Sequence, residues 1–131
     1  MFLNPFKNYP VPSKSGYEFK MQHSFDIRKK EATNLIKKYP DKIPIILEKA
    51  TSSSIPELGK QKFLLPKDFT IGQFLYIIRK HLKLEPSQAI FLFVNNLDIP
   101  SITQSLGSVY ADLSDKDGFL YMTYSAEHTF G

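Results

Sequence analysis

The segment from Phe119 to Tyr124 constrains the fold most, because it is apolar on both of its sides. As a strand it would present Phe119, Tyr121 and Thr123 to one face of a sheet and Leu120, Met122 and Tyr124 to the other. Successive side chains of a strand point to opposite faces. Since both sets are largely apolar, we expect this strand in the interior of a sheet, covered on both faces.

After this strand the chain changes character, and the sequence ends at Gly131. Residues Ser125 to Thr129 are small and polar and show no periodicity, which predicts a flexible C-terminal arm. A carboxyl group on glycine is unhindered, so an enzyme could reach it through a narrow channel. Conjugation through Gly131 is therefore one hypothesis, and an ordinary frayed terminus is the alternative.

Length and composition bound the classes of protein that remain. A chain of 131 residues with 42% hydrophobic residues predicts one domain with a substantial core. The absence of cysteine excludes disulfides, thiol nucleophiles and cysteine-ligated metals. No apolar run approaches membrane-spanning length, and the N-terminus lacks the apolar core of a signal peptide, so we expect neither feature.

The net charge of +4 is unevenly distributed along the chain. Up to Leu84 there are sixteen Lys and Arg against seven Asp and Glu, and from Glu85 onward one against six. A basic face suggests an acidic partner, such as a peptide, an anionic membrane or a nucleic acid. A merely solvated surface is the commoner explanation of such an imbalance.

Hydrophobic periodicity and breaker residues predict an α+β fold. The expected elements, in order, are a short helix at Tyr17–His23, a helix from Phe25 to about Tyr39, strands at Ile43–Lys49 and Gln61–Leu65, a helix after Thr70, a strand at Ile90–Val94, a short helix from about Thr103 to Ala111, and the final strand. This order predicts a mixed sheet with helices on one face. Pro44 predicts an edge or strand-entry position for the first strand.

The helix after Thr70 carries the clearest boundary signals. Thr70 and Gln73 have the spacing of a capping box, in which each residue satisfies a backbone group of the other. Phe69 and Phe74 flank the cap with the spacing of a hydrophobic staple. We therefore expect this helix to begin directly after Thr70.

The helix from Phe25 is amphipathic and strongly basic. Its apolar face is expected to comprise Phe25, Ala32, Leu35, Ile36 and Tyr39, and its other faces carry Arg28, Lys29, Lys30, Lys37 and Lys38. Such a helix could bind a membrane or nucleic acid. No stacking platform or groove-reading element accompanies it, so we do not expect nucleic acid as a partner.

No set of residues has the composition and spacing of a catalytic or metal site. His23, His81 and His128 are scattered, and none has metal-ligand spacing. Asp115 and Asp117 lie in a turn, where aspartate is favoured for backbone reasons. We therefore expect no enzymatic activity, no metal and no cofactor.

The stretch Lys60–Pro66 is the second candidate site. A strand at a sheet edge, flanked by apolar pockets and basic residues, can accept an extended peptide as an added strand. Lys62 and Leu64 should point to one side, and Phe63 and Leu65 to the other. An ordinary edge strand protected by its lysines is the alternative.

Six blocks of this chain occur in an order that points to a known family. They are Lys38–Ile46, Lys62–Pro66, Ile71–Phe74, Ile78–Lys80, Phe93–Asn96 and Asp117–Gly131. Together they resemble the GABARAP-type ubiquitin-like modifiers of autophagy. The resemblance implies a ubiquitin-like β-grasp fold, with a four-stranded mixed sheet preceded by two additional helices.

The resemblance also implies a function. An E1-like enzyme would activate the terminal glycine and pass the protein to an E2-like enzyme. The glycine would then be joined to the amine of phosphatidylethanolamine. The lipidated protein would move from the cytoplasm to an autophagosome or related membrane and recruit cargo receptors through aromatic-x-x-aliphatic motifs. A cysteine protease would process or deconjugate it. The alternative is a purely non-covalent adaptor that binds peptides in the same groove, along the strand edge at Lys60–Pro66.

The resemblance assigns the site residues by position. The aromatic pocket would comprise Glu31, Leu35, Pro44, Ile46, Lys62, Leu64 and Phe119. The aliphatic pocket would comprise Phe63, Leu65, Pro66, Phe69, Phe74 and Ile77. Lys42, Lys60 and Lys80 would contact acidic residues flanking the motif, and Gly131 would be the conjugation point.

The chain departs from the family pattern at three places. We expect an N-terminal arm at residues 1–16, a ubiquitin-like domain with its N-terminal helices at residues 17–125 and a flexible tail at residues 126–131. The arm is longer than the family norm. Aligned with the family pattern, the segment Leu97–Pro100 holds one extra residue. Nothing follows Gly131, whereas many relatives carry extra residues that the protease removes, so this end is either encoded or processed.

Overall fold

The computed structural model describes residues 17–51 and 53–126. The helices are α1 (Glu18–Gln22), α2 (Phe25–Lys38), α3 (Ile71–Leu82) and α4 (Leu106–Leu113), and the strands are β1 (Lys42–Lys49), β2 (Lys62–Pro66), β3 (Phe91–Val94) and β4 (Leu120–Ser125). The expected order of elements is therefore confirmed. The N-terminal arm and residues 127–131, including the expected conjugation point Gly131, lie outside the described residues.

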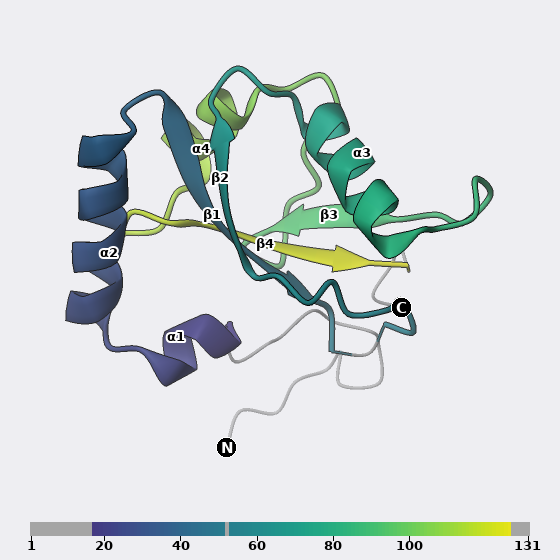
Figure 1. Cartoon of the computed structure of the whole chain (residues 1–131), viewed down its shortest axis with the longest axis horizontal. Coiled ribbons are helices and arrows are strands. Elements are labelled where there is room, and N and C mark those ends of the chain that lie inside the picture. Colours follow the sequence, from purple (N-terminus) through teal and green to yellow (C-terminus); the bar gives the residue numbers. More distant parts are fainter. Residues whose placement is uncertain (1–16, 52, 127–131) are drawn as a thin grey trace.

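The four strands form one mixed sheet in the order β2-β1-β4-β3 (Figure 1). β1 runs antiparallel to β2 and parallel to β4, and β3 runs antiparallel to β4. All six residues of β4 are buried, because this strand has a neighbour on each edge and side chains packed on each face. The expected interior position of the last strand is confirmed.

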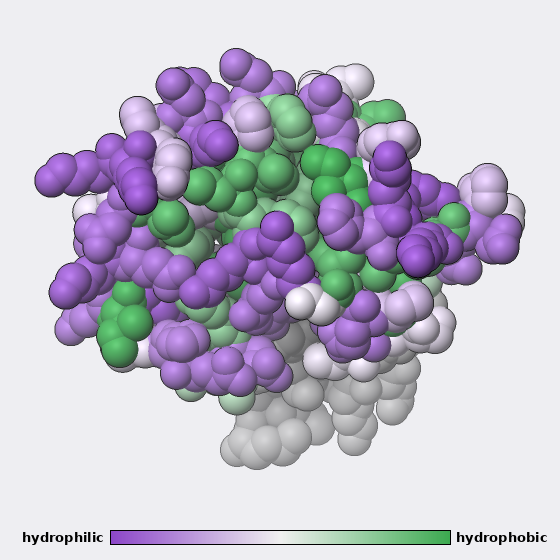
Figure 2. Space-filling view, viewed as in Figure 1, coloured by the Kyte–Doolittle hydropathy of each residue, from purple (hydrophilic) through white to green (hydrophobic). Residues whose placement is uncertain are grey.

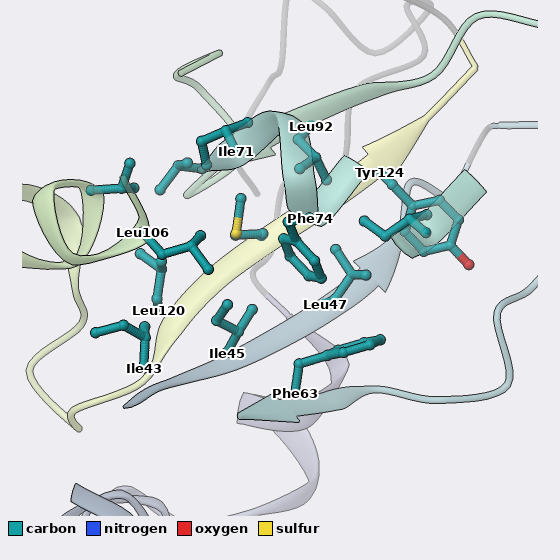
Figure 3. Close-up of a cluster of buried hydrophobic side chains, with 14 of the residues drawn as sticks. Ile43, Ile45, Leu47, Phe63, Ile71, Phe74, Leu92, Leu106, Leu120 and Tyr124 are labelled. Atoms are coloured by element: carbon teal, nitrogen blue, oxygen red, sulfur yellow. The ribbon is translucent and has the colours of Figure 1, made fainter. Parts of the chain in front are cut away.

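Helices cover both faces of the sheet, so the prediction of helices on one face is wrong. On one face, Phe19 of α1 and Ala32 of α2 pack with Phe119 and Tyr121. On the other face, α3 and α4 contribute Ile71, Phe74, Ile78, Leu106 and Val109 to a larger cluster (Figure 3). β4 sends apolar side chains alternately to the two faces, so each face needs its own helical layer.

Pro44 enters the sheet in a central strand, so the edge position predicted for β1 is wrong and the strand-entry position is correct. The Leu47 N–H donates to the Gln61 carbonyl at 2.8 Å. Bonded positions recur at every second residue of an antiparallel pair, so Ile45 bonds to β2 and Pro44 does not. Pairing with β4 begins only at Ile45. The missing N–H of Pro44 therefore costs the sheet no hydrogen bond.

The start of α3 agrees with the sequence signals. The Gln73 N–H donates to Thr70 Oγ1 at 3.1 Å, and the Thr70 N–H donates to Gln73 Oε1 at 2.8 Å. Phe74 is buried, and Phe69 packs against the same cluster. The capping box is thus confirmed, and it fixes α3 beside the end of β2.

The start of α4 differs from its prediction by three residues. The helix begins at Leu106 instead of about Thr103, because Ser105 is its N-cap. The Ser105 hydroxyl accepts a hydrogen bond from the Ser108 N–H at 3.1 Å. Such a side-chain cap satisfies one of the free donors of the first turn.

α2 buries an arginine and exposes its first aromatic residue, contrary to prediction. Phe25 is 42% exposed, whereas Arg28 is only 9% exposed. Arg28 Nε donates to Asp117 Oδ2 at 2.8 Å. Asp117 is fully buried and also accepts hydrogen bonds from the Phe119 N–H and the Tyr121 hydroxyl. Asp117 therefore does more than shape a turn, because a buried carboxylate requires a paired cation.

Candidate functional site

The outer edge of β2 is open among the described residues, since β2 pairs with β1 alone. The register places Phe63 opposite Ile45 at a position that bonds to β1. Alternation then directs the backbone groups of Lys62 and Leu64 away from the sheet. This edge can therefore accept a further strand. In the space-filling view, hydrophobic residues gather over β1 and β2 between α2 and α3, with hydrophilic residues around them (Figure 2).

On the face that α1 and α2 cover, the structure brings together the residues expected for the aromatic pocket. Ile46 and Phe119 are buried in one cluster, and Leu35 packs against it. At the rim, Lys62 Nζ lies 2.7 Å from Glu31 Oε2 and so joins β2 to α2. The other two expected residues, Pro44 and Leu64, are partners in the β1–β2 register.

On the opposite face, the structure brings together the residues expected for the aliphatic pocket. The rings of Phe63 and Phe74 meet edge to face, with centroids 5.3 Å apart, and both side chains belong to the buried cluster. Leu65 and Phe69 are partly buried against that cluster. Pro66 accepts a hydrogen bond from the Phe69 N–H at 3.0 Å. The sixth residue, Ile77, lies with Phe69 in the wall of a cavity of about 450 Å³.

The two sets of expected pocket residues lie on opposite faces of the sheet, which is compatible with the spacing of an aromatic-x-x-aliphatic motif. The two motif side chains are three positions apart, so they point to opposite sides of an extended peptide. A peptide added to the edge of β2 would thus send one anchor to the α2 face and the other to the α3 face. The candidate pockets lie on these two faces.

The three expected flanking lysines do not form one cluster. Lys60 Nζ lies 4.8 Å from the centroid of the Phe63 ring, before the start of β2. Lys42 pairs with Pro66, at the other end of β2. Lys80 lies on α3, with its Nζ 5.5 Å from the centroid of the Tyr76 ring. Acidic residues on either side of a bound motif would therefore meet different lysines.

Sequence reasoning missed the side chains that hold α1 against the sheet. The two carboxylate oxygens of Glu48 accept the N–H groups of Glu18 and Phe19, each at 2.9 Å. Lys20 Nζ donates to Asp115 Oδ1 at 2.6 Å. These partners are far apart in the sequence, so no local pattern could identify them.

A further cavity of about 660 Å³ lies beside the groove and was not predicted. Its walls come from α1, β1, β4 and the segment before β2, and include Tyr17, Met21, Glu48 and Lys60. Lys60 is the one expected groove residue in these walls. Burial raises the pKa of Tyr17 despite the hydrogen bond that its phenol oxygen receives from Thr123.

The described residues offer neither a candidate metal site nor a candidate membrane span. Within residues 17–51 and 53–126, no three His, Asp or Glu side chains are grouped so that they could hold a metal ion. Over the same residues, no helix has the length and apolar character needed to cross a membrane.

Comparison with known proteins identifies the family. Residues 27–131 match the family model described as "Autophagy protein Atg8 ubiquitin like". The chain belongs to the Atg8 family. It is 52% identical over 116 residues to "Autophagy-related protein 8e" of Arabidopsis thaliana, covering 88% of this chain and 94% of the relative. It is 50% identical over 113 residues to "Autophagy-related protein 8" of Mycosarcoma maydis, covering 86% and 95%.

A solved structure of an Atg8 protein agrees with the fold described above. The crystal structure of Trypanosoma brucei ATG8 superposes on this Atg8-family chain with a TM-score of 0.79 at 41% identity, covering 88% of this chain and 98% of that one. The expected ubiquitin-like fold with additional N-terminal helices is thereby confirmed. The chain is a ubiquitin-like autophagy protein, and these matches are to Atg8 proteins in general, not to the GABARAP type in particular.

Proposed function

We propose that this Atg8-family protein is a GABARAP-type modifier, joined through Gly131 to phosphatidylethanolamine, that recruits cargo receptors and adaptors by aromatic-x-x-aliphatic motifs. The observation that carries the proposal is the edge of β2, open among the described residues, between clusters of apolar side chains on opposite faces of the sheet. The family match, which extends to residue 131, supports the conjugation step.

Recognition would begin with strand addition along β2. The outward backbone groups of Lys62 and Leu64 would bond to the peptide main chain, which gives affinity but little selectivity. The two anchors would supply selectivity, because each releases water from apolar surface and contributes about 1.5–3 kcal/mol. The exposed lysines would add a salt-sensitive contribution below about 1 kcal/mol each.

Conjugation would use the carboxyl group of Gly131. The carboxylate would attack the α-phosphate of ATP on an E1-like enzyme, which forms an acyl adenylate and releases pyrophosphate. A cysteine of that enzyme would then displace AMP to form a thioester. After transfer to an E2-like enzyme, the lipid amine would attack the carbonyl, an amide would form, and the cysteine thiol would leave. This chain contains no cysteine, so every thiol in the sequence of steps belongs to a partner.

The proposal includes two states in the cell. The unconjugated protein would be cytoplasmic, and the conjugate would sit on autophagosomal or related membranes. A cysteine protease would hydrolyse the amide and return the protein to the cytoplasm. Nucleic acid is not among the proposed partners.

The first prediction tests conjugation directly. The full chain is incubated with E1-like and E2-like enzymes, ATP and liposomes containing phosphatidylethanolamine, and the product is read by mass. The unaltered chain should gain the mass of the lipid, whereas deletion of Gly131 should abolish both thioester and conjugate. Gly131→Ala should slow conjugation, because the added Cβ hinders the carboxyl.

Unfolding curves of the three proteins supply the control, and they should coincide because β4 ends at Ser125, before the tail. A conjugate formed at normal yield without Gly131 would refute the proposed step. Motif-peptide binding without any conjugate would instead identify a non-covalent adaptor.

A further inference from the structure

The cavity of about 450 Å³ beside α3 extends beyond the expected aliphatic pocket. Its walls are Phe69, Thr70, Gly72, Gln73, Tyr76 and Ile77. Phe69 and Ile77 belong to the aliphatic pocket, but Tyr76 belongs to neither pocket and is 62% exposed. The apolar surface of the groove therefore continues past the pocket onto the outside of α3.

Packing of the core does not account for the exposed ring of Tyr76. α3 buries Ile71, Phe74 and Ile78 against the sheet, and these residues lie on another side of the helix. Beside the same cavity, the Gly72 N–H donates to the carbonyl of Ile102, whose side chain is also 62% exposed. Large apolar side chains left exposed around a hollow are typical of interaction surfaces.

The direction of a bound motif leads its C-terminal residues to this cavity. The expected aromatic pocket uses Lys62 and Leu64 of β2, whereas the aliphatic pocket uses residues up to Pro66 and then Phe69. A motif read from aromatic to aliphatic residue therefore runs in the same direction as β2. Residues after the aliphatic anchor would pass the end of β2 and reach the start of α3.

The alternation of an extended chain selects which residue would enter the cavity. The aliphatic anchor points to the α3 face, so the next side chain points away and the second one points to the α3 face again. That second residue lies about 7 Å beyond the anchor, at about 3.3 Å per residue. This second residue would therefore reach the cavity whose walls include Phe69, Tyr76 and Ile77.

We propose that the cavity between Phe69 and Tyr76 is a third subsite, which takes an apolar side chain at the second position after the aliphatic anchor. This third subsite rests on the proposed peptide groove. It would restrict the partners of the groove to motifs with an apolar residue at the second position after the aliphatic anchor. Lys80, beside the Tyr76 ring, adds a preference for an acidic residue nearby in the peptide.

The test compares two peptides that differ at one position. The first is acetyl-Glu-Glu-Trp-Gln-Thr-Leu-Ser-Leu-Gly-amide, and the second has Ser in place of the second Leu. Each is titrated by calorimetry into the full chain, the Tyr76→Ser variant and a control variant, Leu97→Ser. Leu97 is 78% exposed and lies outside the cavity, so this control removes a comparable exposed apolar side chain.

We expect the unaltered chain to prefer the Leu peptide by about tenfold, which corresponds to about 1.4 kcal/mol. Tyr76→Ser should bind both peptides equally, with the affinity of the unaltered chain for the Ser peptide, and Leu97→Ser should keep the preference. Equal binding of both peptides by the unaltered chain, or an intact preference in Tyr76→Ser, would overturn the subsite and leave the groove standing. Failure of both peptides to bind the unaltered chain would overturn the groove and the subsite together.

Discussion

At the scale of single residues, the ion pair between Arg28 and Asp117 ties α2 to the turn before β4. Asp117 has no exposed surface, so its charge depends on Arg28 and on the hydrogen bonds around it. Replacing one partner of a buried pair leaves an uncompensated charge, which costs about 3–5 kcal/mol. This loss should exceed the effect of any lysine on the exposed side of α2.

Arg28→Met and Lys30→Met test this expectation as a matched pair on one helix, because Lys30 is exposed. Arg28→Met should lower the free energy of unfolding by about 3–5 kcal/mol, and Lys30→Met should change it by less than about 0.5 kcal/mol. Denaturant titration measures both. Equal effects of the two variants would show that the pair contributes nothing beyond surface charge.

Asp115 makes the attachment of α1 sensitive to acid. Burial on its own would raise the pKa of Asp115, but the hydrogen bonds from Lys20 and from the Asp117 N–H, with the charges of Lys20 and Arg28, hold this pKa below its ordinary value. Because the carboxyl is more acidic in the folded state, its contribution to stability is complete above the ordinary carboxyl pKa. The contribution is lost as pH falls through the lowered value.

Asp115→Asn should therefore be less stable than the unaltered chain near neutral pH, and the two should converge in acid. The measurement is the free energy of unfolding at a series of values between about pH 2 and pH 7. A difference that stays constant across this range would rule out the titration of Asp115 as its source.

At the scale of elements, α1 depends on a cap supplied by β1. A helix of five residues is not stable alone. Its own N-cap residue, Tyr17, makes no side-chain cap hydrogen bond, and the Glu48 carboxylate takes two of the helix donors instead. Gln61 Nε2 donates to the same carboxylate at 3.0 Å and so helps to orient it.

Glu48→Ala should therefore release α1 while α3 stays intact, at a cost of about 1 kcal/mol. Hydrogen exchange should accelerate at the amides of Glu18 and Phe19 and remain slow in α3. Glu57→Ala is the control, since the Glu57 side chain is 75% exposed and its ion pair with Lys49 is long, at 3.8 Å. Unchanged exchange in α1 of Glu48→Ala would contradict the capping role.

Sequence patterns predicted correctly those structural features that depend on neighbouring residues. The capping box of Thr70 and the two apolar faces of β4 are readable from neighbouring residues, and the structure confirms both. The burial of Arg28 is not readable in this way, because its partner Asp117 lies 89 residues further along the chain. The same limit applies to Pro44, whose tolerance in β1 depends on where β4 begins to pair.

At the scale of the whole molecule, the proposed groove takes its expected residues from α2, β1, β2, the start and body of α3, and the residue that precedes β4. Its expected residues extend from Glu31 to Phe119, so only a resemblance to a family could assemble them from the sequence. The alternation along β2 predicted that Lys62 and Phe63 point to opposite faces of the sheet. It did not show that helices cover both of these faces. The separation of the three lysines, and the surface around Tyr76, required the three-dimensional arrangement.

The most direct test of the groove is a calorimetric titration of one aromatic-x-x-aliphatic peptide, at low and high salt, into the full chain, Leu64→Ala/Leu65→Ala and Lys60→Ala. Leu64 and Leu65 are half-buried and serve one pocket each, so their truncation disturbs the core less than that of Phe63, which is 6% exposed. The double variant should lose more than about tenfold in affinity, or about 1.4 kcal/mol. Lys60→Ala should lose less than about fivefold, and less still at high salt. Strong binding by the double variant, together with loss of binding in Lys60→Ala, would contradict a groove that selects its partners by apolar anchors.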